Sequence, residues 1–503
     1  MGNERELWYV MRAKTAAPGL MSEDEKPFSG SSFLNAILAR IVSMFLEALE
    51  TLLGKKLFTK GFGDELDYIE PKILRFVLRL VDENIIRSMS FKYPIPDWPK
   101  VICAHLSLEP ITVPSGIPRE ISGSVGDGAA FDHNTAATKA LAECLERYSV
   151  CNYDPNGLIR GSFSELKNKG ALDPNLFKAF SDKQLKDPVY YKNHYFDHST
   201  RFSWTRAISF IDEKQFFVPA QLVFLLYETL EGEPIIRGMT TSGAAAGSSR
   251  EMAAYNAICE AIERDSFMIF WLNKLTSPVI DLSDTDNPVI LKILGECRRY
   301  SIDISFFDIT TDVGVPTVLA VILDAEGRCA VKVAPRADLD IEHAIIDASI
   351  EALRVGVSSD VTASEKEAVD KAGHDIYTLP QRRIFWSDQA RKKDVDFLFG
   401  GPVQKIIKGE FSGTDVGKKL EGLKKILQEK NFKAYLVDVT APIAKEAGLA
   451  VFVSLLPKLY PLYLNEHYKY LGVKRLYEAP VKMGFSKTPR AEENMNIIPH
   501  PML

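Results

Sequence analysis

Apolar residues recur along this chain with two periods, one typical of helices and one typical of strands. Helical spacing covers residues 32–53 and 71–86, and a proline-rich stretch follows at residues 93–99. Short apolar runs typical of strands lie at residues 216–219, 304–308, 317–324, 329–334, 434–440 and 449–456, with a further helix at residues 341–355. We therefore predict an α/β fold of mixed α+β type, preceded by a small N-terminal helical region.

The most informative feature is a segment that occurs twice. Residues 140–149 read ALAECLERYS, and residues 257–266 read AICEAIERDS. At helical spacing, each copy places two glutamates and one arginine on neighbouring parts of one helix face. These residues are Glu143, Glu146 and Arg147 in the first copy, and Glu260, Glu263 and Arg264 in the second. The helix expected at residues 341–355 resembles both copies, with Glu351 in place of the paired acids.

The apolar flanks of the two copies decide how these acids are interpreted. One such segment alone is typical of ion pairs on a solvated helix face. Two copies among core residues predict half-buried carboxylates, which must be paired or bind a metal. Two carboxylates ~4 Å apart repel by ~4 kcal/mol at an effective dielectric constant of about 20, so four converging glutamates require cations. Magnesium and arginine are the natural candidates.

A glycine-rich run precedes each copy. Residues 122–129 (SGSVGDGA) lead through Asp132 or Asn134, either of which is a good N-cap, into the first copy. Residues 240–251 (TTSGAAAGSSRE) lead into the second copy, where Ser248 and Glu251 have the spacing of a capping box. A glycine-rich turn before a helix N-terminus is an anion-binding geometry. Neither run is a Walker A loop.

Length, charge and cysteine spacing exclude several classes of protein. The length of 503 residues predicts more than one domain. A net charge of -6 without a basic stripe argues against a nucleic-acid partner. Six cysteines without Cys-x-x-Cys spacing favour a reduced, cytoplasmic protein over a zinc ribbon or a disulfide framework. The apolar run at residues 33–58 is interrupted by charges, and no signal peptide is seen, so we expect no membrane association.

Taken in order, these segments resemble the YcaO family over about residues 122–503. Further matching stretches are residues 308–316 (DITTDVGVP), the helix with Glu351, and residues 496–501 (NIIPHP). The resemblance implies a YcaO-type ATP-binding fold with an internal pseudo-repeat in residues 101–503. Residues 1–100 then form a helical, winged-helix-like module for docking a peptide or a partner.

The resemblance is greatest to azoline-forming cyclodehydratases, which mature thiazole- and oxazole-containing peptides such as bacteriocins. There, a Cys, Ser or Thr side chain of a ribosomal precursor peptide attacks the preceding backbone carbonyl. ATP phosphorylates the amide oxygen, and loss of phosphate leaves a thiazoline or an oxazoline. Two alternatives stay open: a related enzyme that installs a thioamide or an amidine, and a non-catalytic scaffold of a maturation complex.

The resemblance also implies cofactors, site residues and partners. ATP and Mg²⁺ are the expected cofactors, with Glu143, Glu146, Glu260 and Glu263 as magnesium and phosphate ligands. The expected nucleotide-binding residues also include Arg147, Arg264, Ser248, Asn256 and Glu351. The expected catalytic residues are Pro499, His500 and Pro501, with His500 as general base. Expected partners are the precursor peptide, a separate ThiF-like or winged-helix leader-binding protein and a flavin-dependent azoline dehydrogenase, in a homodimer or a hetero-complex.

Three positions depart from the family pattern. Asp127 replaces the lysine of a Gly-Lys-Gly run, Lys139 replaces a serine, and Asp347 replaces an arginine. A lysine is thus lost at residue 127 and gained at residue 139. Either the gained lysine restores the positive charge that a phosphate needs, or the exchange weakens nucleotide binding. Both outcomes stay open at the level of sequence.

Overall fold

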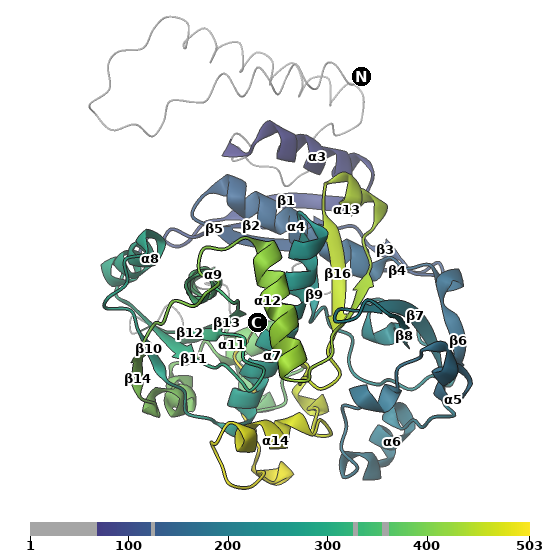
Figure 1. Ribbon diagram of the computed structural model, residues 1–503. Coiled ribbons are helices and arrows are strands. Elements are labelled where there is room, and N and C mark those ends of the chain that lie inside the picture. The colour runs from purple at the N-terminus through teal and green to yellow at the C-terminus, as the bar shows by residue number, and fades with distance from the viewer. Residues whose placement is uncertain (1–67, 122–125, 325–329, 355–361, 503) are drawn as a thin grey trace, which may run out of the picture.

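The computed structural model describes residues 68–121, 126–324, 330–354 and 362–502, and the helix expected at residues 32–53 lies outside them. Figure 1 shows the long helix α7 (Arg250–Asn273) in the middle of the molecule, with β-sheets above it and to both sides. No described helix combines the length and the apolar character that a membrane crossing requires.

The first sheet consists of three antiparallel strands, β1 (Ile86–Lys92), β2 (Ile102–Leu108) and β5 (Gly126–Ala130). Helix α3 (Pro71–Asp82) packs against β1, and α4 (His133–Cys151) packs along β2 and β5. The helix expected at residues 71–86 ends at Asp82, because Asn84 adopts a left-handed φ of 56° and β1 then begins. The domain boundary expected near residue 100 falls inside this sheet, since β1 precedes it and β2 follows it. A separate small hairpin pairs β3 (Ile111–Thr112) with β4 (Pro118–Arg119).

The second sheet has the strand order β13-β12-β11-β10-β14. Its strands are β10 (Val279–Asp281), β11 (Ile302–Asp308), β12 (Thr317–Asp324), β13 (Val331–Ala337) and β14 (Val403–Lys405). Helices α8 (Pro288–Arg299) and α9 (Ile341–Leu353) pack on it. All pairs are antiparallel except β10 with β14. The strands predicted at residues 304–308 and 317–324 and the helix predicted at residues 341–355 are confirmed.

The third sheet has the order β6-β7-β15-β16-β9, and β8 pairs with β7. Its strands are β6 (Ile159–Ser162), β7 (Arg201–Ser209), β8 (Gln215–Pro219), β9 (Ala244–Gly247), β15 (Tyr435–Asp438) and β16 (Ala450–Leu455). Helix α7 lies on β9 and β16, and α12 (Val416–Glu429) packs against α7. The remaining helices are α5 (Phe163–Leu166), α6 (Pro188–His194), α10 (Ala363–Ala372), α11 (Leu379–Phe385), α13 (Pro442–Glu446) and α14 (Arg475–Lys482).

The internal repeat is a strand followed by a helix that packs back onto it. The units are β5 with α4, β9 with α7, and β13 with α9. Glycines permit the close approach in the first two units. A Cβ atom on Gly128 would lie 2.0 Å from the Ala136 carbonyl oxygen, and one on Gly247 would lie 2.4 Å from the Ala253 nitrogen. These glycines therefore serve helix–strand packing.

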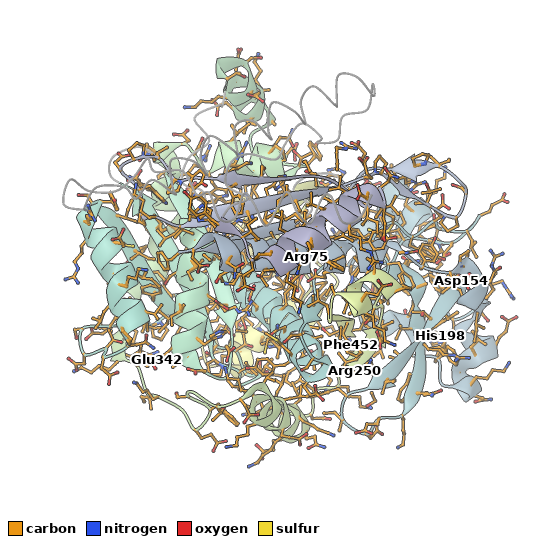
Figure 2. All side chains as sticks on the ribbon, turned by 90° about the horizontal axis from the view of Figure 1, so that it is seen from above. Arg75, Asp154, His198, Arg250, Glu342 and Phe452 are labelled. Carbon is orange, nitrogen blue, oxygen red and sulfur yellow. The ribbon has the colours of Figure 1, made fainter. Side chains whose placement is uncertain are left out.

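Side-chain caps fix where the repeat helices begin. Asp132 accepts a hydrogen bond from the Thr135 nitrogen (2.8 Å) and caps α4. Ser249, rather than the expected Ser248, caps α7. Figure 2 shows Arg250 beside Phe452 at this end of α7, with the guanidinium 4.8 Å from the ring centroid.

Candidate functional site

The first acidic motif is an arginine forked between two glutamates on α4. Arg147 donates to Glu143 (2.8 Å) and to Glu146 (2.7 Å). Glu143 also accepts from the backbone nitrogen of Asp127 on β5, at 3.0 Å. Glu146 accepts from the Ala246 nitrogen on β9, at 3.3 Å. The first helix is therefore tied to the strand that precedes the second helix.

The second motif on α7 repeats this fork. Arg264 lies 3.0 Å from Glu260 and 3.3 Å from Glu263. Its third contact is the sulfur of Met502, at 2.7 Å. The end of the described chain thus lies against the second motif.

Electrostatics shows that the two motifs face one another. Burial raises the pKa of Glu146 to about 8, and the negative charges of Glu260 and Glu143 add to this shift although Arg147 opposes it. Burial likewise raises the pKa of Glu263 to about 7 against the opposing charges of Arg264 and Arg336. Each motif therefore holds one buried carboxyl group whose negative charge is incompletely compensated.

The four glutamates are turned toward their own arginines. Across the described ranges, no group of three or more His, Cys, Asp or Glu side chains is placed to hold a metal ion. A shared metal site would therefore require the forked side chains to rearrange. The metal role of the four glutamates stays a prediction.

The third helix contributes one end of the site. Glu351 pairs with Arg354 at 2.9 Å, and its negative charge also helps to raise the pKa of Arg264 on α7. Arg354 in turn lies 3.3 Å from Asp127 on β5. The end of α9 therefore lies between the first motif and the second.

The three departures from the family pattern are matched by neighbouring charges. Lys139 on α4 pairs with Asp347 on α9 at 3.8 Å, and Asp347 also lies 3.4 Å from Arg336. Asp127 accepts a hydrogen bond from His105 (2.6 Å) and pairs with Arg354 (3.3 Å). Each of the three charged side chains thus has a partner of opposite charge. Lys139 pairs with Asp347, and Asp127 pairs with Arg354.

The two further nucleotide-binding candidates differ in position. Ser248 is exposed in the turn between β9 and α7, and its hydroxyl lies 3.4 Å from the Met252 sulfur. Asn256 is half-buried on α7, one turn before Glu260 and on the same helix face. Asn256 therefore borders the second motif, whereas Ser248 marks the N-terminal end of its helix.

The tail around His500 is packed into the interior. His500 is fully buried, and its Nε2 lies 2.7 Å from the Tyr463 carbonyl oxygen. Arg382 donates to the His500 carbonyl oxygen (2.6 Å), and Trp386 donates to that of Pro499 (3.1 Å). Burial and nearby cations hold the pKa of His500 well below its usual range. Nδ1 is buried and has no partner among the described residues.

Sequence reasoning missed two arginines that shape this region. Arg336 on β13 pairs with Asp347, and its positive charge opposes the raised pKa of Glu263. Its signal is a second charged residue, after Lys332, in a mainly apolar strand that precedes the third repeat helix. Arg382 on α11 carried no local signal, because both Glu466 and the tail reach it from distant parts of the chain.

The raised carboxyl pKa values predict that stability falls as the pH rises. In the unfolded chain these groups ionise near their ordinary pKa, whereas folded Glu263 and Glu146 keep their protons up to about pH 7 and about pH 8. The folded state therefore binds more protons than the unfolded chain in this pH range, and the free energy of unfolding should drop on going from pH 6 to pH 8 by about 3–4 kcal/mol. Urea unfolding at both pH values measures this drop.

The double variant Glu146→Gln/Glu263→Gln should flatten that pH dependence. Glu421→Gln on the exposed face of α12 removes one charge elsewhere and should leave it unchanged. An equally steep loss in the double variant would show that other groups cause it.

Most of this chain matches a known protein family. The family described as YcaO cyclodehydratase, ATP- and Mg²⁺-binding, matches residues 127–460. An uncharacterized protein of Methanothermobacter thermautotrophicus is 31% identical over 198 residues, which cover 39% of this chain and 48% of that protein. An uncharacterized protein in the tfuA 3′ region of Rhizobium leguminosarum bv. trifolii is 25% identical over 214 residues, covering 41% and 47%. The chain thus spans about half the length of these curated relatives.

Solved structures share the fold. A heterocyclase in complex with substrate and cofactor has a TM-score of 0.69 at 22% identity, covering 89% of this chain and 59% of its own. The heterocyclase TruD has a TM-score of 0.56 at 24% identity, covering 73% and 50%. A YcaO protein from Methanopyrus kandleri, solved with AMPPCP and Mg²⁺, has a TM-score of 0.55 at 16% identity, covering 82% and 97%.

Proposed function

The chain belongs to the YcaO family, and from that premise we propose that it is an ATP- and Mg²⁺-dependent peptide cyclodehydratase. It converts Cys, Ser or Thr residues of a ribosomal precursor peptide to thiazolines or oxazolines. The observation that carries this proposal is the pair of forked motifs on α4 and α7, which lie close enough that the negative charge of Glu260 on α7 helps to raise the pKa of the buried Glu146 on α4.

The residues present fit magnesium and a nucleotide. Carboxylate oxygens are the ligands that Mg²⁺ prefers, and the incompletely compensated acids Glu146 and Glu263 favour a cation. Arg147 and Arg264 have the fork geometry that binds phosphate oxygens. Glu143 and Glu260 share these arginines, while Asn256, Ser248 and Glu351 border the same region. When bound, Mg-ATP supplies the phosphoryl group that turns the amide oxygen into a leaving group.

The chain's own part is to orient the peptide and to move a proton. We assign the general base to the tail, whose residues Pro499, His500 and Pro501 lie just before Met502 at Arg264. With Nε2 donating to Tyr463, the proton acceptor of neutral His500 is Nδ1. A His500→Gln variant with an unchanged pH–rate profile would remove His500 from this role.

Mass spectrometry tests the reaction directly. The full-length chain, Mg-ATP, the precursor peptide and a leader-binding partner should together remove one water per ring formed. Exchange of oxygen for sulfur would instead identify a thioamide-forming enzyme, and exchange of oxygen for nitrogen without ring closure an amidine-forming one. ATP binding without any modified peptide would support the non-catalytic scaffold. We also propose a flavin-dependent azoline dehydrogenase as a later partner, and a homodimer or hetero-complex as the working assembly.

A further inference from the structure

Arg237 differs from the other arginines around the site because it has no carboxylate partner among the described residues. It lies in the segment between β8 and β9 and is partly buried. The paired arginines nearby are Arg147, Arg264, Arg336, Arg354, Arg382 and Arg475. Desolvation lowers the pKa of Arg237, and only Tyr470 opposes this effect. Arg237 is therefore a cation whose positive charge the protein leaves uncompensated.

The backbone on both sides of Arg237 is held in place. The Ile236 nitrogen donates to the Gln221 side chain at 2.8 Å. The Gly238 nitrogen donates to the Tyr470 hydroxyl at 3.0 Å. The Gln221 amide is itself fixed by Glu233, at 3.0 Å. Because these contacts fix the main chain, the Arg237 side chain starts from a rigid backbone.

Arg237 lines one cavity, and its neighbour Gly238 lines a second, partly aromatic one. It lines a space of about 30 Å³ together with Arg264 and Tyr460, which is room for roughly two waters. A second cavity, of about 290 Å³, has Gly238 in its lining together with four aromatic side chains. These are Phe180, Tyr463, Tyr468 and Tyr470. A ligand in the smaller space would contact both Arg237 and Arg264.

We propose that Arg237 binds an oxyanion that a ligand brings into this space, either a carboxylate of a peptide or a phosphoryl group. An uncompensated, partly buried guanidinium costs free energy, and a charge-assisted hydrogen bond to an oxyanion offsets that cost. The aromatic cavity beside it would hold an apolar side chain of the same peptide. Oxyanion binding at Arg237 needs neither nucleotide nor turnover, so it is tested independently of cyclodehydration.

Calorimetric titration of the full-length chain tests the proposal with two probes, inorganic phosphate and N-acetyl-glutamate N-methylamide. We expect one probe to bind, and Arg237→Gln to weaken its binding by about tenfold or more, the typical loss of a charged hydrogen bond. Arg237→Lys should retain part of the affinity. The probe that binds identifies the source of the oxyanion, and the neutral glutamine analogue should not bind.

Arg206→Gln, on the exposed side of β7, is the matched control because it removes the same charge and should leave binding unchanged. Thermal melting of the ligand-free variants adds a second readout. Arg237→Gln should melt no lower than the wild type, since it removes an uncompensated charge. The proposal is overturned if neither probe binds in an Arg237-dependent way, or if Arg237→Gln lowers the melting temperature and thereby shows a structural role.

Discussion

Glu260→Gln should abolish magnesium-dependent ATP binding. Glu260 is the partly exposed acid of the second motif, with 20% of its side chain accessible, so a ligand can reach it without unfolding the helix. The amide has the same shape but no charge, so it neither binds Mg²⁺ well nor holds Arg264 as firmly. Loss of a charged ligand worth about 3 kcal/mol weakens binding by more than about 100-fold. Calorimetry with Mg-ATP measures the change.

Glu421→Gln is the control for this substitution, because it makes the same chemical change on an exposed face of α12. It should bind Mg-ATP as the wild type does. A thermal melt of Glu260→Gln within a few degrees of the wild type would exclude general unfolding. Undiminished ATP affinity in a folded Glu260→Gln protein would contradict the assignment of the nucleotide to the paired motifs.

Arg382→Met should destabilise the protein by about 3–5 kcal/mol, which is the typical cost of breaking a buried ion pair. Arg382 is fully buried and donates to Glu466 (2.7 Å), to the Leu464 carbonyl (2.6 Å) and to the His500 carbonyl (2.6 Å). Its removal leaves the buried Glu466 carboxylate with Lys469 as its cationic partner among the described residues and the His500 backbone nitrogen as a hydrogen-bond donor. Urea unfolding measures the loss, and limited proteolysis should show faster cleavage of the tail.

Arg383 offers a matched control on the same helix. It follows Arg382 directly but is exposed, so Arg383→Met should change stability by less than about 0.5 kcal/mol. The double variant Arg382→Met/Glu466→Leu should recover part of the lost stability, because it removes the stranded charge as well. Equal losses in the single and double variants would show that the ion pair is not the cause.

Local patterns in the sequence predicted the features that depend on residues close together in the chain. Strand β12 (Thr317–Asp324) was predictable because its sequence is a nearly continuous apolar run. Such a run is typical of a strand that is buried on both faces, and β12 is buried along nearly its whole length. The pairing of Arg147 with Glu143 follows from their four-residue helical spacing, whereas the contact of Arg147 with the adjacent Glu146 does not. The early end of α3 was missed, because it depends on the left-handed conformation of Asn84.

Contacts between distant segments were beyond local reasoning. Glu146 accepts from Ala246 only because β9 lies beside α4. Arg382 meets Glu466 and the tail only in the folded chain. The family resemblance placed the tail near the site, but it carried no information on the side chains that hold it there. Tertiary pairing of this kind has no periodicity along the sequence.

The contact between Lys139 on α4 and Asp347 on α9 has a consequence for evolution. The two charges offset one another between the first and third units of the repeat, so neither substitution is tolerated well without the other. The two positions should therefore covary among relatives, with a neutral residue at one accompanying the loss of the acid at the other. Asp127 and Arg354 should form a second covarying pair. If only one position of such a pair were considered, the nucleotide site of a relative would be classed as degenerate. Both positions together identify a site whose charges are compensated.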